Sequence, residues 1–146
     1  MTKLSESVVI ERPVEEVFTF LDQPANNLLW QPGTVESRQL TEGPTQVGTR
    51  IEQVTHFLGR RLEIILEISE HIRNKSATAK WSGPISGQST YHLEPADGGT
   101  RLTISGEVEG HGFFKLAEPA FAAIAKRELR TSVDNLKDPL EARVDE

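Results

Sequence analysis

The sequence predicts an α+β protein in which a seven-stranded antiparallel sheet curls around one long C-terminal helix. Residues 112–140 place apolar side chains three and four residues apart, which is the helical period. Most of the preceding chain alternates apolar and polar residues, as strands with one buried face do. A sheet that is apolar on one face needs a cover, and residues 112–140 form the only long helix that the pattern offers.

A strand and two short helices are expected at the N-terminus. Residues 5–11 contain a run of β-branched side chains and predict the first strand. Pro13 suits the first turn of a helix, where its missing N–H costs nothing, and the two glutamates that follow favour the positive end of the helix dipole. This helix should end near Asp22, and residues 24–29 can hold one more helical turn.

Six further strands follow, joined by turns rich in Gly, Pro, Asn and Asp. The clearest is residues 61–70, in which four aliphatic side chains, from Leu62 to Ile68, occupy alternate positions. Sequential strands with tight turns form an antiparallel meander. With no repeat, linker or low-complexity tract, residues 1–146 are interpreted as one domain. The six predicted strands are residues 35–40, 49–58, 61–70, 76–82, 88–94 and 100–108.

Composition narrows the function classes. The 146 residues carry a formal net charge of −6, which argues against a nucleic-acid partner. The absence of cysteine excludes disulfides and Cys-ligated metals, and it fits a reducing compartment. The N-terminus has no apolar run like a signal peptide, and no segment approaches the ~20 apolar residues of a membrane helix. We therefore expect a cytoplasmic protein without an integral membrane segment.

Three motifs resemble a known superfamily: VIERPVEEVF at residues 9–18, VGTR at 47–50 and GGTRLT at 98–103. Over about residues 5–136 the chain resembles the START / Bet v 1-like (SRPBCC) superfamily, and most closely its polyketide cyclase/dehydrase-like lipid-transport branch. The resemblance implies the helix-grip fold and a cavity between sheet and helix that holds an apolar small molecule. The motifs are strand ends, turn glycines and core positions, so they name neither a ligand nor a reaction.

The predicted strand order brings four loops to one end of the barrel, called the mouth: residues 30–33, 58–60, 83–87 and 110–112. Exposed apolar groups on flexible loops would favour a ligand entrance there. The alternative is that these side chains pack the end of the barrel. The apolar residues at the mouth are Trp30, Phe57, Leu58, Ile85, Phe113 and Phe114.

The candidate ligand-binding residues come from the inward faces of the strands, the mouth and the apolar side of the helix. Aromatic walls beside small side chains leave room for a flat or apolar ligand, unless phenylalanines of the helix fill the space. Glu118 either faces this space or is turned to solvent by a kink at Pro119. The predicted set is Trp30, Gln53, Phe57, Leu66, Ala79, Trp81, Ser89, Tyr91, His111, Phe114, Glu118, Phe121 and Ala125.

The histidines do not have the spacing of metal ligands, so no metal site and no cofactor is expected. Alternation turns His56 and His92 outward and places His71 at the end of the sheet opposite the mouth. A structural or surface role is expected for all three. His111 lies between two mouth glycines and could act as an acid or base.

The sequence is compatible with three functions. The first is binding or transport of an apolar small molecule, lipid-like or polyketide-like. The second is an enzyme of the cyclase, dehydratase or hydrolase type with His111, Glu118 or Tyr91 near the ligand. The third is an accessory protein that docks a partner through the mouth. A convergent pair of titratable groups would favour the enzyme, and the sequence offers at most one candidate. Catalytic residues stay unassigned, and the expected partners are the apolar ligand and, as an open option, a second copy in a homodimer.

Overall fold

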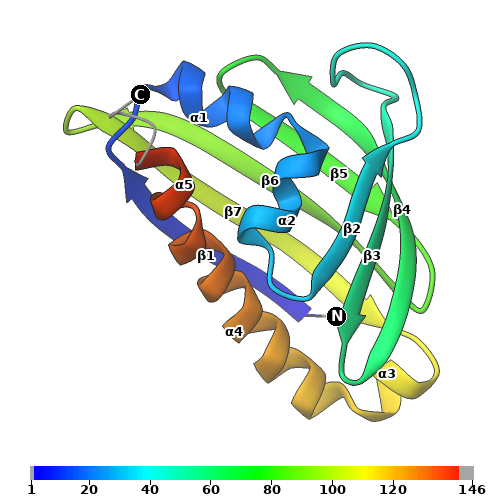
Figure 1. Cartoon of the computed structure of the whole chain (residues 1–146). Helices are drawn as coiled ribbons and strands as arrows, with labels where there is room; N and C mark the ends of the chain where they lie inside the picture. Colours follow the sequence, from blue (N-terminus) through cyan, green and yellow to red (C-terminus); the bar gives the residue numbers. More distant parts are fainter. Residues whose placement is uncertain (1, 142–146) are drawn as a thin grey trace.

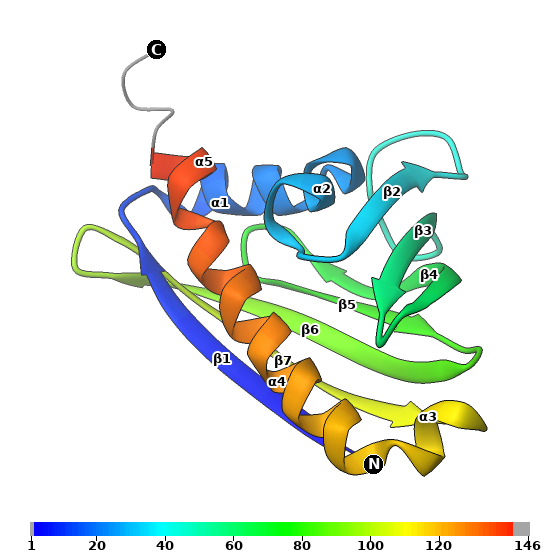
Figure 2. The ribbon, with the colours of Figure 1, turned by 60° about the horizontal axis from the view of Figure 1, so that its bottom comes forward.

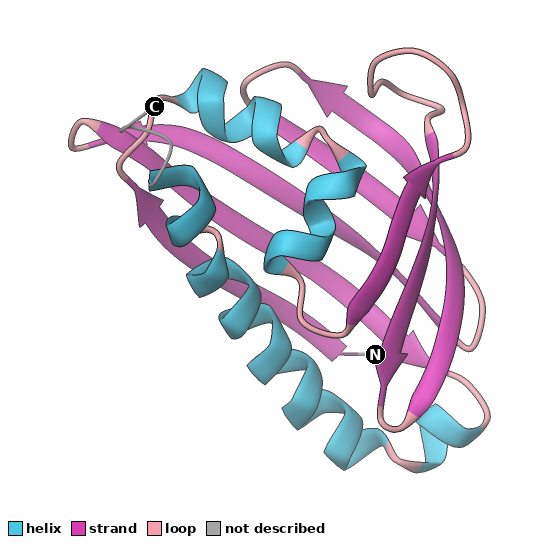
Figure 3. Ribbon diagram, viewed as in Figure 1, coloured by secondary structure: helices cyan, strands magenta, loops and turns pink. Residues whose placement is uncertain are grey.

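The computed structural model describes residues 2–141, apart from the side chain of Glu118, and shows one curved antiparallel sheet with the helices on its concave side (Figures 1 and 3). The strand order is β1-β7-β6-β5-β4-β3-β2, and every neighbouring pair is antiparallel. The predicted fold class is therefore confirmed. The strands are β1 (Thr2–Ile10), β2 (Thr34–Gln39), β3 (Arg50–Phe57), β4 (Arg60–Ile72), β5 (Ser76–Trp81), β6 (Ile85–Ala96) and β7 (Gly99–Gly110).

The helices depart from the prediction of one continuous element over residues 112–140. At Ala117 the backbone leaves the helical region (φ −94°, ψ 19°), and Pro119 then lies in the first turn of a new helix, where a proline is tolerated best. A second break falls at Leu136, whose N–H bonds to the carbonyl of Val133 in a tightened turn. The helices are α1 (Val14–Leu21), the 3₁₀ turn η1 (Pro24–Asn26), α2 (Asn27–Trp30), α3 (Phe113–Leu116), α4 (Glu118–Asn135) and α5 (Lys137–Glu141).

Strand β4 contains a β-bulge that changes the face of its last residues. The pairing with β5 shifts between Ile68 and Glu70, so the alternation of side chains restarts there. After the shift His71 pairs with Ala77, which is buried on the inner face. Of the structural or surface role expected for His71, the structural alternative fits this position, because the side chain is only 14% exposed.

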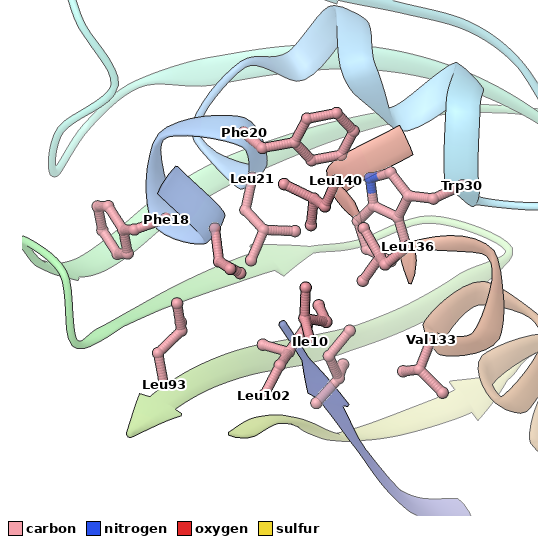
Figure 4. Close-up of a cluster of buried hydrophobic side chains, with 12 residues drawn as sticks. Ile10, Phe18, Phe20, Leu21, Trp30, Leu93, Leu102, Val133, Leu136 and Leu140 are labelled. Carbon is pink, nitrogen blue, oxygen red and sulfur yellow. The ribbon is translucent and has the colours of Figure 1, made fainter. Parts of the chain in front are cut away.

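Two clusters of apolar side chains close the two ends of the sheet. The larger joins β1, β6 and β7 to α1, α2, α4 and α5, with Ile10, Leu102 and Leu136 fully buried (Figure 4). The smaller consists of Phe57, Leu62, Ile85, Phe114 and Phe121, with the Phe57 and Phe121 rings 5.5 Å apart.

The smaller cluster lies at the predicted mouth and corrects one expectation. Phe57, Ile85 and Phe114 are buried there, and Trp30 is buried in the larger cluster. They are not exposed on flexible loops, because each packs within one of the two apolar clusters. Phe113 remains 44% exposed, under the guanidinium of Arg60 at 4.2 Å from the ring centre. Gly83 to Gly87 is also not wholly a loop, since β6 begins at Ile85.

Arg12, just after the end of β1, fastens this part of the chain to α5. Its guanidinium donates hydrogen bonds to the backbone carbonyls of Leu140 and Glu141, and the Glu11 N–H donates to the Glu141 carboxylate. β1 pairs along its whole length with β7. The first strand and the last helix are thus held together where Figure 1 shows β1 ending beside α5.

Helix α4 covers only part of the concave face. It packs mainly against β1, at one edge of the sheet, while α2 and η1 pack against β2 at the other edge. Figure 2 shows α4 crossing in front of β1 and β7, with β2 and β3 curled up on the opposite side. The inner faces of the central strands therefore lie between these two sets of helices.

Candidate ligand cavity

A cavity of about 330 Å³ occupies the space between the two apolar clusters. This size lies within the range of small-molecule sites in proteins. Its walls come from β3 to β7, from α1 and α2, and from α4. Most of the lining is apolar, including Ile51, Phe57, Leu62, Ile64, Leu66, Ile68, Trp81, Ile104, Phe121 and Leu129.

Most of the predicted ligand-binding residues line this cavity. Leu66 is partly exposed rather than fully buried, because its side chain faces the open space. Ala79 and Ser89 pair across β5 and β6, and their small side chains leave space in the cavity beside these strands. The predicted residues that line the cavity are Trp30, Gln53, Phe57, Leu66, Ala79, Trp81, Ser89, Tyr91, Phe121 and Ala125.

Two predicted residues are described and do not line the cavity. His111 is exposed, and its Nε2 lies 2.9 Å from the hydroxyl of Ser86 on the outside of the barrel end. Phe114 is buried in the aromatic cluster that closes that end. The prediction for the side chain of Glu118 lies outside the described part of the structure.

An amide network forms one polar stretch of the wall. The Gln53 side chain accepts a hydrogen bond from Asn27 Nδ2 (3.1 Å) and donates one to Gln31 Oε1 (2.8 Å). Gln31 Oε1 also accepts from the Thr34 hydroxyl. Because Gln53 and Asn27 are buried, these bonds satisfy groups that would otherwise be costly to desolvate. The network fixes α2 to β2 and β3 and so holds that wall in place.

A second polar group lies where α1 meets the sheet. The Tyr91 hydroxyl donates to Asp22 Oδ1 at 3.1 Å, and His71 Nε2 lies 2.9 Å from Asp22 Oδ2. Burial, and secondly the charge and hydrogen bond of Asp22, raise the pKa of Tyr91 well above its ordinary value. The phenol is therefore neutral and acts as a donor. Asp22 and Tyr91 line the cavity, whereas His71 does not line it and contacts Asp22.

Glu128 is a third polar feature, on the face of α4 that borders the cavity. Burial among apolar neighbours raises the pKa of its carboxyl to about 7. The nearby Ser132 hydroxyl donates to the backbone carbonyl of Glu128 and is therefore occupied. Near neutral pH the cavity thus holds a carboxyl group that is present in both protonated and ionised forms.

Sequence reasoning missed Asp22, His71 and Glu128 as members of this region. Glu128 had a usable signal, since it lies between Ala125 and Ser132 at helical spacing on the apolar stripe. Asp22 follows the last turn of α1, and nothing in its local sequence shows which way its side chain turns. His71 was hidden by the bulge in β4.

Two other kinds of site are absent from the described part of the chain. Among residues 2–141, no helix has the length and apolar character needed to cross a membrane. Within the same residues, no group of three or more His, Asp or Glu side chains is arranged to hold a metal ion.

Solved structures share this architecture along its whole length. A protein from Thermus thermophilus superposes with a TM-score of 0.84 at 14% identity, covering 97% of this chain and 98% of its own. A START superfamily protein from Mycobacterium smegmatis gives 0.81 at 13% identity, with 97% and 99% covered. Ara h 8.0201 gives 0.68 at 14% identity, with 96% and 97% covered. At these identities the likeness shows the fold alone.

The sequence itself is matched by one family model. No curated protein matches it. The family model described as "Polyketide cyclase / dehydrase and lipid transport" matches residues 1–141. The resemblance stated from the three motifs is confirmed by this match and by the START structure. The chain therefore belongs to the polyketide cyclase/dehydrase and lipid transport family.

Proposed function

We propose that this protein binds or carries an apolar small molecule in the cavity between its sheet and α4. One observation carries the proposal: a cavity of about 330 Å³ with largely apolar walls lies between two well-packed clusters. Protein interiors pack densely and seldom keep open space of this size without use. Family and fold support the same reading, because both are associated with hydrophobic ligands and neither names one.

The proposed contacts are the cavity-lining members of the predicted set. The aromatic faces of Trp81 and Tyr91 stand beside the small Ala79 and Ser89, an arrangement that suits a flat ring or an alkyl chain. Lipid-like and polyketide-like molecules both meet this description.

A thermal-shift screen tests the proposal. A ligand that binds only the folded state at ~100 times its dissociation constant stabilises it by about 2.7 kcal/mol. For a chain of this size the melting temperature should rise by roughly 5–10 °C. The screen would use fatty acids, fatty alcohols, isoprenoids and aromatic polyketides, and native mass spectrometry would look for a co-purified molecule. No shift with any compound, together with no co-purified molecule, would contradict the proposal.

Filling the cavity provides the matched variant. Ala79→Leu adds volume inside the cavity and should abolish the shift, whereas Ala123→Leu adds the same volume on the exposed face of α4 and should leave it unchanged. If both variants respond like the parent, the ligand binds elsewhere. The accessory role would then be favoured, with the exposed Phe113 and Leu116 as the surface to test.

An enzyme of the cyclase or dehydratase type is the second candidate. It is favoured by the presence of titratable side chains at two places in the cavity lining, Glu128 on α4 and Asp22 with Tyr91 where α1 meets the sheet. If Glu128 transfers a proton during a reaction, Glu128→Gln should retain unprocessed substrate. Native mass spectrometry of parent and variant from one host would then find bound molecules of different mass. Identical bound molecules would favour the carrier.

Two further features stay predictions. A cytoplasmic location would be tested by cell fractionation, and a homodimer by analytical ultracentrifugation of the purified chain.

A further inference from the structure

The cluster of Asp22, His71 and Tyr91 is assembled from three parts of the chain. His71, Ala77 and Tyr91 are consecutive partners across β4, β5 and β6, so they form one row on the inner face. Ala77 is small, and Phe18 of α1 fills the space above it, with its ring centre 5.2 Å from His71 and 6.0 Å from Tyr91. This packing sets the two rings at the ends of the row, where Asp22 contacts both.

The polar hydrogens of this cluster are already used. Tyr91 donates its only hydroxyl hydrogen to Asp22 Oδ1. A carboxylate only accepts, so the contacts of His71 Nε2 with Asp22, at 2.9 and 3.1 Å, require the imidazole to donate. The Thr45 hydroxyl, which also lines the cavity, donates to the backbone carbonyl of Asp22 at 2.7 Å. What remains toward the cavity is lone pairs on the oxygens of Asp22, Tyr91 and Thr45.

From this arrangement we infer that the α1 end of the cavity is a binding site for a hydrogen-bond donor, and that the ligand is an apolar molecule bearing a hydroxyl or amine group. The inference rests on the proposed function and adds the polar chemistry of the ligand to it. Among residues 2–141 as described, Asp22 Oδ2 accepts only from His71. A carboxylate oxygen can accept two hydrogen bonds, so one acceptor position is open there within this part of the chain. A ligand hydroxyl or ammonium can fill it.

Ligands with acceptors alone are disfavoured at this site for a physical reason. A carboxylate, ester or ether oxygen placed there would face lone pairs without a hydrogen between them. A carboxylate would also meet the charge of Asp22 in a partly buried setting, where such repulsion is weakly screened. Hydrogen bonds to charged groups are among the stronger ones, so a donor should gain about tenfold or more in affinity.

Competition with a neutral dye tests the inference. Nile red carries no N–H or O–H and reports apolar binding regardless of this polar end. It would be displaced at pH 8 by four probes of equal chain length, each below its micellar concentration: decan-1-ol, decylamine, decyl methyl ether and decanoic acid. Decanol and decylamine should displace the dye at concentrations about tenfold or more below those of the other two. Because decanol and the ether differ in one donor and no charge, this comparison holds without any variant.

Variants then locate the acceptor. Asp22→Asn should bring the displacing concentrations of the four probes close together, each measured against the variant's own affinity for Nile red. Tyr91→Phe keeps the carboxylate and should keep the preference for decanol over the ether. Asp134→Asn, on the exposed side of α4, is the matched control and should change nothing.

The outcomes separate the two claims. If Nile red does not bind and no probe shifts the melting temperature, the proposed function fails and the inference fails with it. If Nile red binds but the ether and decanoic acid compete as well as decanol, only the inference is overturned. The same holds if the preference survives Asp22→Asn or disappears with Glu128→Gln, since the acceptor would then lie elsewhere.

Discussion

Glu128 offers a direct test of how dry the cavity is. Its carboxyl lies half-buried on the cavity face of α4, and burial raises its pKa from an ordinary 4.5 to about 7. In the unfolded chain the group should titrate near the ordinary value. Between about pH 4.5 and 7 the folded state therefore holds a proton that the unfolded state has released. The contribution of Glu128 to the free energy of unfolding therefore falls as the pH rises through this window, and the loss is complete above it.

The size of the effect can be bounded from the same shift. A pKa raised from 4.5 to about 7 corresponds to an upper limit of about 3 kcal/mol. Because the group is half-exposed, water screens its charge, and we expect about 1 kcal/mol. Glu128→Gln removes the charge and keeps the shape. The variant should match the parent within about 0.5 kcal/mol at pH 4.5 and exceed its stability by about 1 kcal/mol at pH 8.5.

Urea unfolding at pH 4.5, 6, 7 and 8.5 and constant ionic strength is the assay. The difference in free energy of unfolding between parent and variant reports the titration of Glu128, since all other groups titrate in both proteins. Glu42→Gln, in an exposed turn, should give a flat difference over the same range. A difference that is flat for Glu128→Gln as well, or a variant less stable than the parent at pH 8.5, would refute the idea that the carboxyl faces a poorly hydrated cavity.

Three further predictions concern the packing of the core, the backbone at two glycines and the contact between the end of β1 and α5. Leu102→Ala should lower the free energy of unfolding by about 3–5 kcal/mol because Leu102 is fully buried. Leu66→Ala should lower it by about 1 kcal/mol because Leu66 already borders the cavity. Equal losses in urea unfolding would mean that the space beside Leu66 is packed. Gly33→Ala should lower the free energy of unfolding by about 2–3 kcal/mol, since φ is +82° and the new Cβ would lie 2.7 Å from a backbone carbonyl oxygen of β3. Gly43→Ala, at φ +90° with no atom within 4 Å of the new Cβ, should lower it by about 1 kcal/mol. Similar losses for the two variants would contradict the steric explanation. Arg12→Met should cost about 1–3 kcal/mol by removing donors to backbone carbonyls, and an unchanged melting curve would contradict that role.

The strands were predictable because their signal is local. Alternation within residues 61–70 and helical spacing within residues 112–140 are each readable from one stretch, and the order of elements then leaves few topologies. The cavity walls followed for the same reason, since the inward face of a regular strand is fixed by its pattern. Leu66, Ala79 and Tyr91 were placed on the correct face in this way.

The remaining errors come from positions where regularity breaks. A single extra residue in β4 moved His71 to the inner face, and only the pairing with β5 reveals it. The break at Ala117 let Phe114 turn into the aromatic cluster and left α3 as a separate turn. Asp22 is held at the cavity by His71 and Tyr91, which lie 49 and 69 positions further along the sequence. No periodic pattern encodes contacts at such separations.

The pairing of β1 with β7 has a consequence for how the protein is made. All other strand pairs join neighbours in sequence, but β1 must wait for a partner that lies about 100 residues further along the chain. The Arg12 contacts with Leu140 and Glu141 come later still. A nascent chain whose α4 is still inside the ribosome can form the meander from β2 to β7, but it has no closed cavity. An apolar ligand should therefore be taken up only after synthesis has passed α5. Until then the inner face of the sheet is exposed, and its apolar side chains can bind chaperones.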